Sequence, residues 1–242
     1  MADWFLKVKK DFITCFLEKD RWHYILQGLG NTLKIALVAV LLGVVIGTVV
    51  AIIRSTYDKN AATMRPGIVR FLLGLGNAVC RIYLTVIRGT PVMIQILIMF
   101  FVIFSNARDG VPVAMLTFGI NSGAYVAEIF RGGILSIDKG QFEAGRSLGF
   151  NYVQTMAYIV VPQVIKNVLP ALANEFISLL KETSVAGYVT VADLTYAGNR
   201  IRGVTFSPFM PLIAVALIYL VLVMFFTKLV SLLERRLRNS DH

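Results

Sequence analysis

The chain has 242 residues, of which 57% are hydrophobic and 16% are charged, and its mean hydropathy is +0.71. Soluble globular domains carry about 25% charged residues, so this composition excludes an ordinary water-soluble domain and indicates a membrane protein. The formal net charge of +10 does not indicate nucleic-acid binding, because no nucleic-acid-reading motif accompanies it.

The N-terminal segment, residues 1–30, combines charged residues with apolar residues at helical spacing: Trp4, Phe5, Val8, Phe12 and Phe16. This pattern predicts an amphipathic helix in the membrane interface, with a tail that packs on the helix bundle as the alternative. The segment has no uncharged core of the kind found in signal peptides, so we expect no cleavage.

Four uncharged, apolar windows follow, at residues 35–53, 89–107, 110–127 and 209–227. Each is close to the roughly 20 residues that a helix needs to cross a bilayer. Because the windows are continuous rather than alternating, they favour membrane-spanning helices over barrel strands.

Basic residues follow the first, third and last windows, and positive loops favour the cytoplasmic side. The residues are Arg54, Lys59, Arg65, Arg70 and Arg81, then Arg131, Lys139 and Arg146, and finally Arg235, Arg236 and Arg238. One outward span must then lie between Arg146 and Phe209. The prediction is five spans with an external N-terminus, against which the net charge of the basic N-terminal segment argues mildly.

Two stretches compete for the fourth span, 147–165 and 169–191, and we favour the second although it contains Glu175, Lys181 and Glu182. Charges inside a span cost roughly 2.5–3.5 kcal/mol each and are kept where they face a bundle interior or a watery cavity. Pro162 and Pro170 predict a break or kink in this stretch.

A polar segment at residues 143–149 interrupts the spans. Residues 141–148 predict a short helix, and Gly149 suits a left-handed cap. This segment resembles the cytoplasmic loop of ABC importer permeases, which reads EAA, three residues, Gly, nine residues, Ile, one residue, Leu-Pro. The matching residues here are Glu143-Ala144-Gly145, then Gly149 after three residues, Ile159 after nine more, and Val161-Pro162 after one more. Gly145 replaces the second Ala and Val161 replaces Leu. An ordinary capped loop is the alternative.

The resemblance implies that this helix couples the chain to an ATPase through Glu143, Ala144, Gly145 and Gly149. A second match narrows the family to polar amino acid permeases of the His/Gln/Arg type. It consists of Arg88-Gly89-Thr90-Pro91 with Gln95, Thr32-Leu33, Asn174-Glu175-Phe176-Ile177 and Lys181-Glu182-Thr183-Ser184. The resemblance covers roughly residues 30–235.

The fold it implies is an all-α membrane protein, a five-transmembrane-helix permease bundle of the type I ABC importer kind with a short cytoplasmic coupling helix. We expect an interfacial segment at 1–30, a permease domain at 31–232 with the coupling loop at about 136–162, and a basic cytoplasmic tail at 233–242. The expected loop between the first two spans, 57–75, is longer than usual for the family.

Intramembrane polar residues are candidates for the substrate path: Glu175, Asn174, Asn121, Gln95 and Lys181. Glu175 is the strongest candidate, because a buried carboxylate needs a cationic partner, either Lys181 or a ligand. Glu128 and Arg131 are spaced for an ion pair on one helix. We expect Arg88 to play a structural role at the cytoplasmic end of the second span.

No GxxxxGK[ST] phosphate loop occurs, so ATP hydrolysis is expected on another chain. We therefore predict a multi-pass permease subunit of the cell membrane that is not an enzyme and holds no cofactor, with ATP and Mg²⁺ bound by a partner ATPase. The other expected partners are a second permease subunit, either identical or paralogous, an extracellular binding protein, an amino acid and the lipid bilayer. An ion-coupled secondary transporter or channel is the alternative, disfavoured by the lack of an internal repeat, and a structural scaffold is a third possibility.

Overall fold

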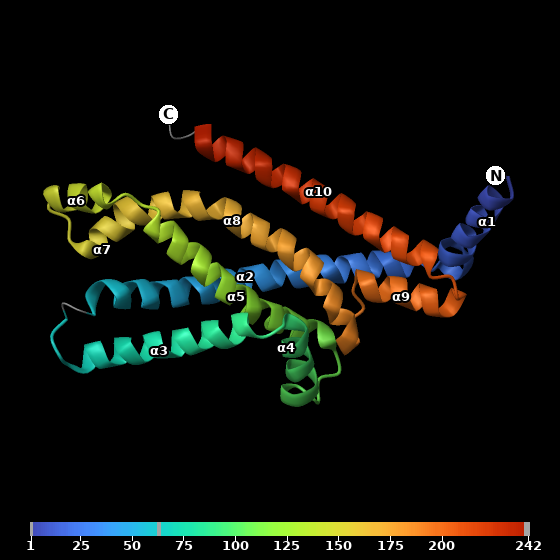
Figure 1. Ribbon diagram of the computed structural model, residues 1–242, viewed down its shortest axis with the longest axis horizontal. Coiled ribbons are helices and arrows are strands. Elements are labelled where there is room, and N and C mark those ends of the chain that lie inside the picture. The colour runs from blue at the N-terminus through green and yellow to red at the C-terminus, as the bar shows by residue number, and fades with distance from the viewer. Residues whose placement is uncertain (1, 62–63, 240–242) are drawn as a thin grey trace. The chain divides into compact units, whose positions relative to one another are not determined.

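The computed structural model describes residues 2–61 and 64–239, and within these ranges it is helical, with no strand. Figure 1 shows the long helices and the short ones between them. The α-helices are α1 Ala2–Phe12, α2 Trp22–Asn60, α3 Ile68–Gly89, α4 Val92–Ile98, α5 Gly110–Leu135, α6 Lys139–Ser147, α7 Tyr152–Thr155, α8 Val161–Glu182, α9 Leu194–Thr205 and α10 Phe209–Asn239. Short π-helical stretches are η1 Ile13–Leu17, η3 Met99–Ile103 and η4 Met156–Val160, and short 3₁₀ stretches are η2 Glu18–Asp20 and η5 Thr183–Val189.

Within the described ranges, five stretches of helix are long and apolar enough to cross a membrane. They are Trp22–Lys59, Ile68–Gly89, Gly110–Leu135, Tyr152–Val189 and Phe209–Leu237. The prediction of an all-α bundle with five spans is therefore confirmed.

The predicted position of the second span is wrong. The span is α3, whereas the window at 89–107 contains only an apolar helix at Val92–Ile103, which is too short to cross. Arg70, Arg81 and Arg88 lie on α3 and excluded it from a search for uncharged windows. The expected loop at 57–75 shrinks to the residues between α2 and α3, and Arg88 lies in the last turn of α3 rather than at the start of a span.

The fourth span draws on both competing stretches. It starts at Tyr152, passes through the π-helical turn η4 and continues through α8 into η5 as far as Val189. The predicted irregularity is the π-helical turn η4, which lies directly before Pro162, a residue with no backbone N–H to donate. Pro170 lies inside α8.

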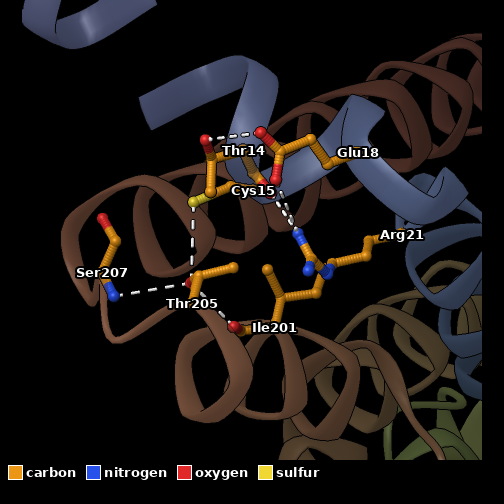
Figure 2. Close-up of polar contacts among 7 residues, drawn as sticks. All are labelled: Thr14, Cys15, Glu18, Arg21, Ile201, Thr205 and Ser207. Carbon is orange, nitrogen blue, oxygen red and sulfur yellow. Dashed lines mark hydrogen bonds and ion pairs between the residues drawn. The ribbon is translucent and has the colours of Figure 1, made fainter. Parts of the chain in front are cut away.

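The chain divides into two compact units, one of residues 1–39, 92–118 and 177–228, the other of residues 40–91, 119–176 and 229–242. In the first unit the N-terminal segment packs on α9. Cys15 and Phe16 are buried in a cluster with Leu194, Ala197, Ile201 and Val215. Cys15 Sγ lies 3.8 Å from Thr205 Oγ1, and Arg21 donates to the Thr14 carbonyl (Figure 2).

The predicted N-terminal helix is present as α1, and Trp4 and Phe12 are exposed on it. Burial of Cys15 and Phe16 shows that the following turn packs on protein, as in the alternative interpretation. The interfacial position of α1 stays a prediction, as does the division at residues 30 and 232, although α2 starts at Trp22 and α10 continues to Asn239.

In the second unit, α2 and α5 approach closely at two glycines of α2. A Cβ on Gly43 would lie 2.7 Å from Ser122 Oγ, and one on Gly47 would lie 2.6 Å from Val126 Cγ1. Small residues one turn apart are a common device for close helix packing in membranes. Two apolar clusters complete this unit: one joins α2, α3 and α5 around Val50, Cys80, Leu84, Ala124 and Ala127, and the other surrounds Ile137, Val160, Val164 and Val168.

Candidate functional site

The short helix α6 carries the motif residues and is capped at both ends. Asp138 Oδ1 accepts the Gly140 N–H at 2.6 Å at its start. At its end Gly149 has φ +79°, in the left-handed region, and the Phe150 N–H reaches the Gly145 carbonyl at 3.0 Å. The predicted helix and its glycine cap are confirmed, with the helix starting two residues earlier than expected.

Gly145 is buried against α7. A Cβ at this position would lie 2.6 Å from Thr155 Oγ1 and 2.7 Å from Thr155 Cγ2. Thr155 is itself buried, and Asn151 and Gln154 form a reciprocal capping box at the start of α7. The replacement of the family's second Ala by Gly is therefore explained by close packing of α6 on α7.

The other motif residues face outward. Glu143, Ala144 and Gly149 are exposed, so the side of α6 opposite Thr155 is open to a partner. The four predicted coupling residues thus divide into three at the surface and Gly145 inside, and their contact with an ATPase stays a prediction.

A cavity of about 480 Å³ lies beside α6, between the end of α2 and the end of α5. Its cations outnumber its anions. The charged lining residues are Lys59, Arg131, Lys139 and Arg146 against Asp58 and Glu143, and the ring residues are Phe142 and Tyr152. Arg131 Nη1 and Asp58 Oδ2 lie 3.7 Å apart, which joins α5 to α2 at this end.

Glu175, the strongest substrate-path candidate, is half-buried in the fourth span. Its Oε1 accepts a hydrogen bond of 2.8 Å from Ser122 Oγ on α5. Ser122 and its neighbour Asn121 are buried, whereas Asn174 is exposed and donates to the Pro170 carbonyl at 3.1 Å.

The remaining two candidates belong to the other compact unit. Gln95 is half-buried on α4, and Lys181 is exposed near the end of α8. The structure thus brings Glu175 together with Ser122 and the buried stretch of α5 that holds Asn121. The role of all five residues in transport stays a prediction.

Glu128 forms the predicted pair with Arg131, at 3.8 Å, together with two contacts that sequence reasoning missed. Its carboxylate lies 3.3 Å from Arg54 of α2 and 3.9 Å from Arg88 of α3. Spacing on one helix identifies the first pair, but residues 74 positions apart carry no such signal. Arg54, Arg81 and Arg88 also line a second cavity of about 510 Å³ with Glu128.

Asp193, at the start of α9, was not singled out from the sequence. Its side chain is fully buried and accepts the N–H groups of Thr195 and Tyr196 at 3.0 and 2.9 Å. Burial raises the pKa of this carboxyl from 3.8 to about 6, against the lowering effect of those hydrogen bonds. An Asp directly before a helical stretch is a capping signal that sequence reasoning had available.

Thr32, one of the family-matching residues, lies in the same part of the first unit. Its Oγ1 accepts the Leu194 N–H at 3.2 Å, and the neighbouring Asn31 donates to the Ala192 carbonyl at 2.9 Å. These contacts join the third turn of α2 to the start of α9.

Among the residues that the structure describes, no group of three or more His, Cys, Asp or Glu side chains is arranged to hold a metal.

Residues 61–239 match the family described as binding-protein-dependent transport system inner membrane component. The chain is 34% identical over 221 residues to the arginine transport system permease protein ArtQ of Bacillus subtilis, covering 90% of this chain and 94% of that protein. It is 38% identical over 168 residues to the glutamine transport system permease protein GlnP of Escherichia coli K12, covering 68% and 77%.

Solved structures share the fold. The chain matches a structure described as an amino acid ABC transporter with histidines at a TM-score of 0.79 and 38% identity, covering 91% of this chain and 98% of the other. An inward-facing form of the MetNI methionine ABC transporter matches at a TM-score of 0.71 and 20% identity, covering 88% and 96%, which shows similarity of fold alone.

Proposed function

Because the chain belongs to the family of binding-protein-dependent transport system inner membrane components, we propose that it forms the membrane path of an ATP-driven importer of polar amino acids. It is a multi-pass protein of the cell membrane. The names of its arginine and glutamine transport relatives support a polar amino acid as the substrate.

We place ATP hydrolysis on a separate ATPase chain, which binds ATP and Mg²⁺. No phosphate-loop motif occurs in the sequence, so this chain has no P-loop to cradle nucleotide. An extracellular binding protein delivers the substrate, and a second permease subunit completes the path, because a five-span chain encloses little volume. The observation that carries this proposal is the exposed Glu143-Ala144 on a helix capped at both ends.

Charge reversal on α6 tests the coupling surface. Glu143→Lys places a cation on the exposed side of α6 while leaving the packing of Gly145 on Thr155 intact. We expect the ATPase chain to co-purify poorly with this variant, or to hydrolyse ATP without uptake. Glu234→Lys, at an exposed glutamate of α10, is the matched control and should behave like the wild type. Normal assembly and normal uptake by Glu143→Lys would exclude this surface from coupling.

Glu175 is the proposed substrate contact. In the low-dielectric interior of the span its carboxylate has the Ser122 hydroxyl as a neutral hydrogen-bond donor. A cationic substrate group that reaches Glu175 would form a charge-assisted hydrogen bond with its carboxylate. The buried Asn121 on the same stretch of α5 offers amide donors and acceptors for a zwitterion.

Substitution at Glu175 tests substrate recognition. Glu175→Gln keeps the shape and removes the charge, so we expect uptake of basic amino acids to fall far more than uptake of neutral ones. Ser122→Ala removes the hydrogen bond and keeps the carboxylate, so the preference for basic substrates should survive. Uptake of radiolabelled arginine and glutamine provides the comparison. Equal losses for both substrates in Glu175→Gln would rule out charge recognition at this residue.

A further inference from the structure

The cytoplasmic end of α2 extends past its apolar part. The helix has 39 residues, which corresponds to about 58 Å at 1.5 Å per residue, whereas the hydrocarbon core is about 30 Å thick. The uncharged window ends at residue 53, and the basic residues Arg54 and Lys59 follow it on the same helix. Lys59 therefore lies in the last turns of α2, beyond the uncharged window, where it contacts the loop that carries α6 and α7.

Lys59 joins this extension to both short helices of the loop. Its Nζ lies 4.1 Å from the centroid of the Phe142 ring on α6 and 4.1 Å from the centroid of the Tyr152 ring on α7. A cation within about 6 Å of an aromatic ring centroid is attracted to the ring face. Phe142 directly precedes Glu143, and Tyr152 follows Gly149 by three residues, so the two rings flank residues 143–149.

The surroundings explain why rings rather than a carboxylate hold this ammonium. Asp58, the adjacent acidic residue, is paired with Arg131, and Glu143, the other carboxylate that lines the cavity, forms no ion pair with Lys59 among the described residues. Arg146 and Lys139 line the same cavity and repel a further cation. Aromatic faces attract the ammonium without requiring another anion.

The two short helices form one unit on which Lys59 can act. Gly145 of α6 packs directly against Thr155 of α7, so Phe142 and Tyr152 belong to helices in close contact. Ser136–Asp138 link α6 to α5, and α7 continues through η4 into α8 as part of the fourth span. The contact of Lys59 adds a connection to α2 that the covalent chain does not provide, since coupling travels through packed side chains and rigid elements.

We propose that Lys59 is a positioning residue for energy coupling: held between the rings of Phe142 and Tyr152, it passes a movement of the α6–α7 loop to α2. The proposal rests on the proposed function, because it assigns the loop as the receiver of ATPase movement. It adds a second route, from the loop sideways into the first span, to the direct covalent connections with α5 and α8.

The test uses the complete transporter, with its ATPase and binding protein, reconstituted in liposomes. Lys59→Met removes the charge and keeps a flexible chain of similar length, whereas Lys59→Arg keeps a cation for the rings. Tyr152→Leu removes one ring, whereas Tyr152→Phe keeps it. Lys139→Met is the matched control: it removes another cation of the same cavity, and among the described residues Lys139 has no contact with an aromatic ring. The readouts are the subunit composition, basal ATP hydrolysis, and the number of amino acids imported per ATP hydrolysed.

We expect Lys59→Met and Tyr152→Leu to retain the ATPase subunit and basal hydrolysis, while the import ratio falls about fivefold or more, the lower end of typical coupling between sites. The import ratio should stay within about twofold of the wild-type value in the three control variants, Lys59→Arg, Tyr152→Phe and Lys139→Met. A merely structural role would change assembly and basal hydrolysis as well, so the ratio separates the two roles.

Unchanged import ratios in Lys59→Met and Tyr152→Leu would overturn the proposal while leaving the proposed function intact. Loss of the ATPase subunit from Lys59→Met would also overturn it, because Lys59 would then shape the docking surface rather than transmit movement. A wild-type complex that imports nothing with ATP would refute the proposed function itself, and the role of Lys59 with it.

Discussion

Gly145 shows how the absence of a side chain allows close packing in the coupling loop. Thr155 occupies the space that a Cβ at this position would need, with Oγ1 at 2.6 Å and Cγ2 at 2.7 Å from it. Both atoms belong to a buried side chain, so they have little freedom to move. The packing of α6 on α7 therefore depends on the pair rather than on Gly145 alone.

Gly145→Ala should lower the thermal stability of the chain, with a cost of about 1–3 kcal/mol that is typical of overpacking. Thr155→Ala removes both crowding atoms, so the double variant should recover much of the lost stability. Thermal unfolding in detergent and co-purification with the ATPase measure the effect. If Gly145→Ala alone is as stable as the wild type, the close contact with Thr155 does not constrain position 145.

The raised pKa of Asp193 predicts that the stability of the folded chain depends on pH. Burial raises its pKa from 3.8 to about 6, so the folded chain holds this proton at pH values where the unfolded chain has released it. The resulting stability is fully present below about pH 4 and is lost as the pH rises through about 6, a difference on the order of 3 kcal/mol.

Asp193→Asn keeps an N-cap residue but cannot ionise, so its stability advantage over the wild type should grow as the pH rises from 4 to above 6. Asp138→Asn, which alters the exposed cap of α6, is the control and should show no comparable gain. Melting temperatures between pH 4 and 8 provide the measurement. A constant difference between Asp193→Asn and the wild type across that range would contradict the assignment.

At the scale of helices, short-range signals predicted α6 and its Gly149 cap, because caps depend on residues a few positions apart. The position of the second span was missed for a physical reason. Arg81 and Arg88 are seven residues apart and share one side of α3, whereas the exposed apolar side chains of Val79, Ile82 and Val86 occupy another. Counting charges in a window ignores which face they occupy. The link from Glu128 to Arg54 was missed because tertiary packing alone brings α2 and α5 together.

The contact of α2 with α5 depends on small residues, and this gives a prediction for a helix pair. Gly47→Ala should destabilise the chain by about 1–3 kcal/mol, because its Cβ would lie 2.6 Å from Val126 Cγ1. Gly74→Ala on α3 is the matched control, since its Cβ would lie 3.8 Å from Tyr57 Cε2, an ordinary contact. Thermal unfolding of the two variants should therefore differ, and equal stability would show that the α2–α5 approach tolerates a methyl group.

For the whole molecule, composition predicted a membrane protein, the uncharged windows and basic residues predicted five spans, and the pattern from Glu143 to Pro162 predicted the family. The candidate substrate path was predicted less completely. Glu175 was identified because a charge inside a span is costly, but its hydrogen bond to Ser122 joins segments 53 residues apart. No local pattern encodes that distance, so the partner emerges only from the fold.

We propose that this chain moves amino acids only when an ATPase drives it. The most direct measurement is uptake of a labelled polar amino acid into liposomes that contain the chain with its ATPase, with ATP inside and the loaded binding protein outside. We predict uptake that stops when ATP, the ATPase or the binding protein is omitted. Sustained uptake by the chain alone, driven by an ion gradient, would contradict the account and establish a secondary transporter instead.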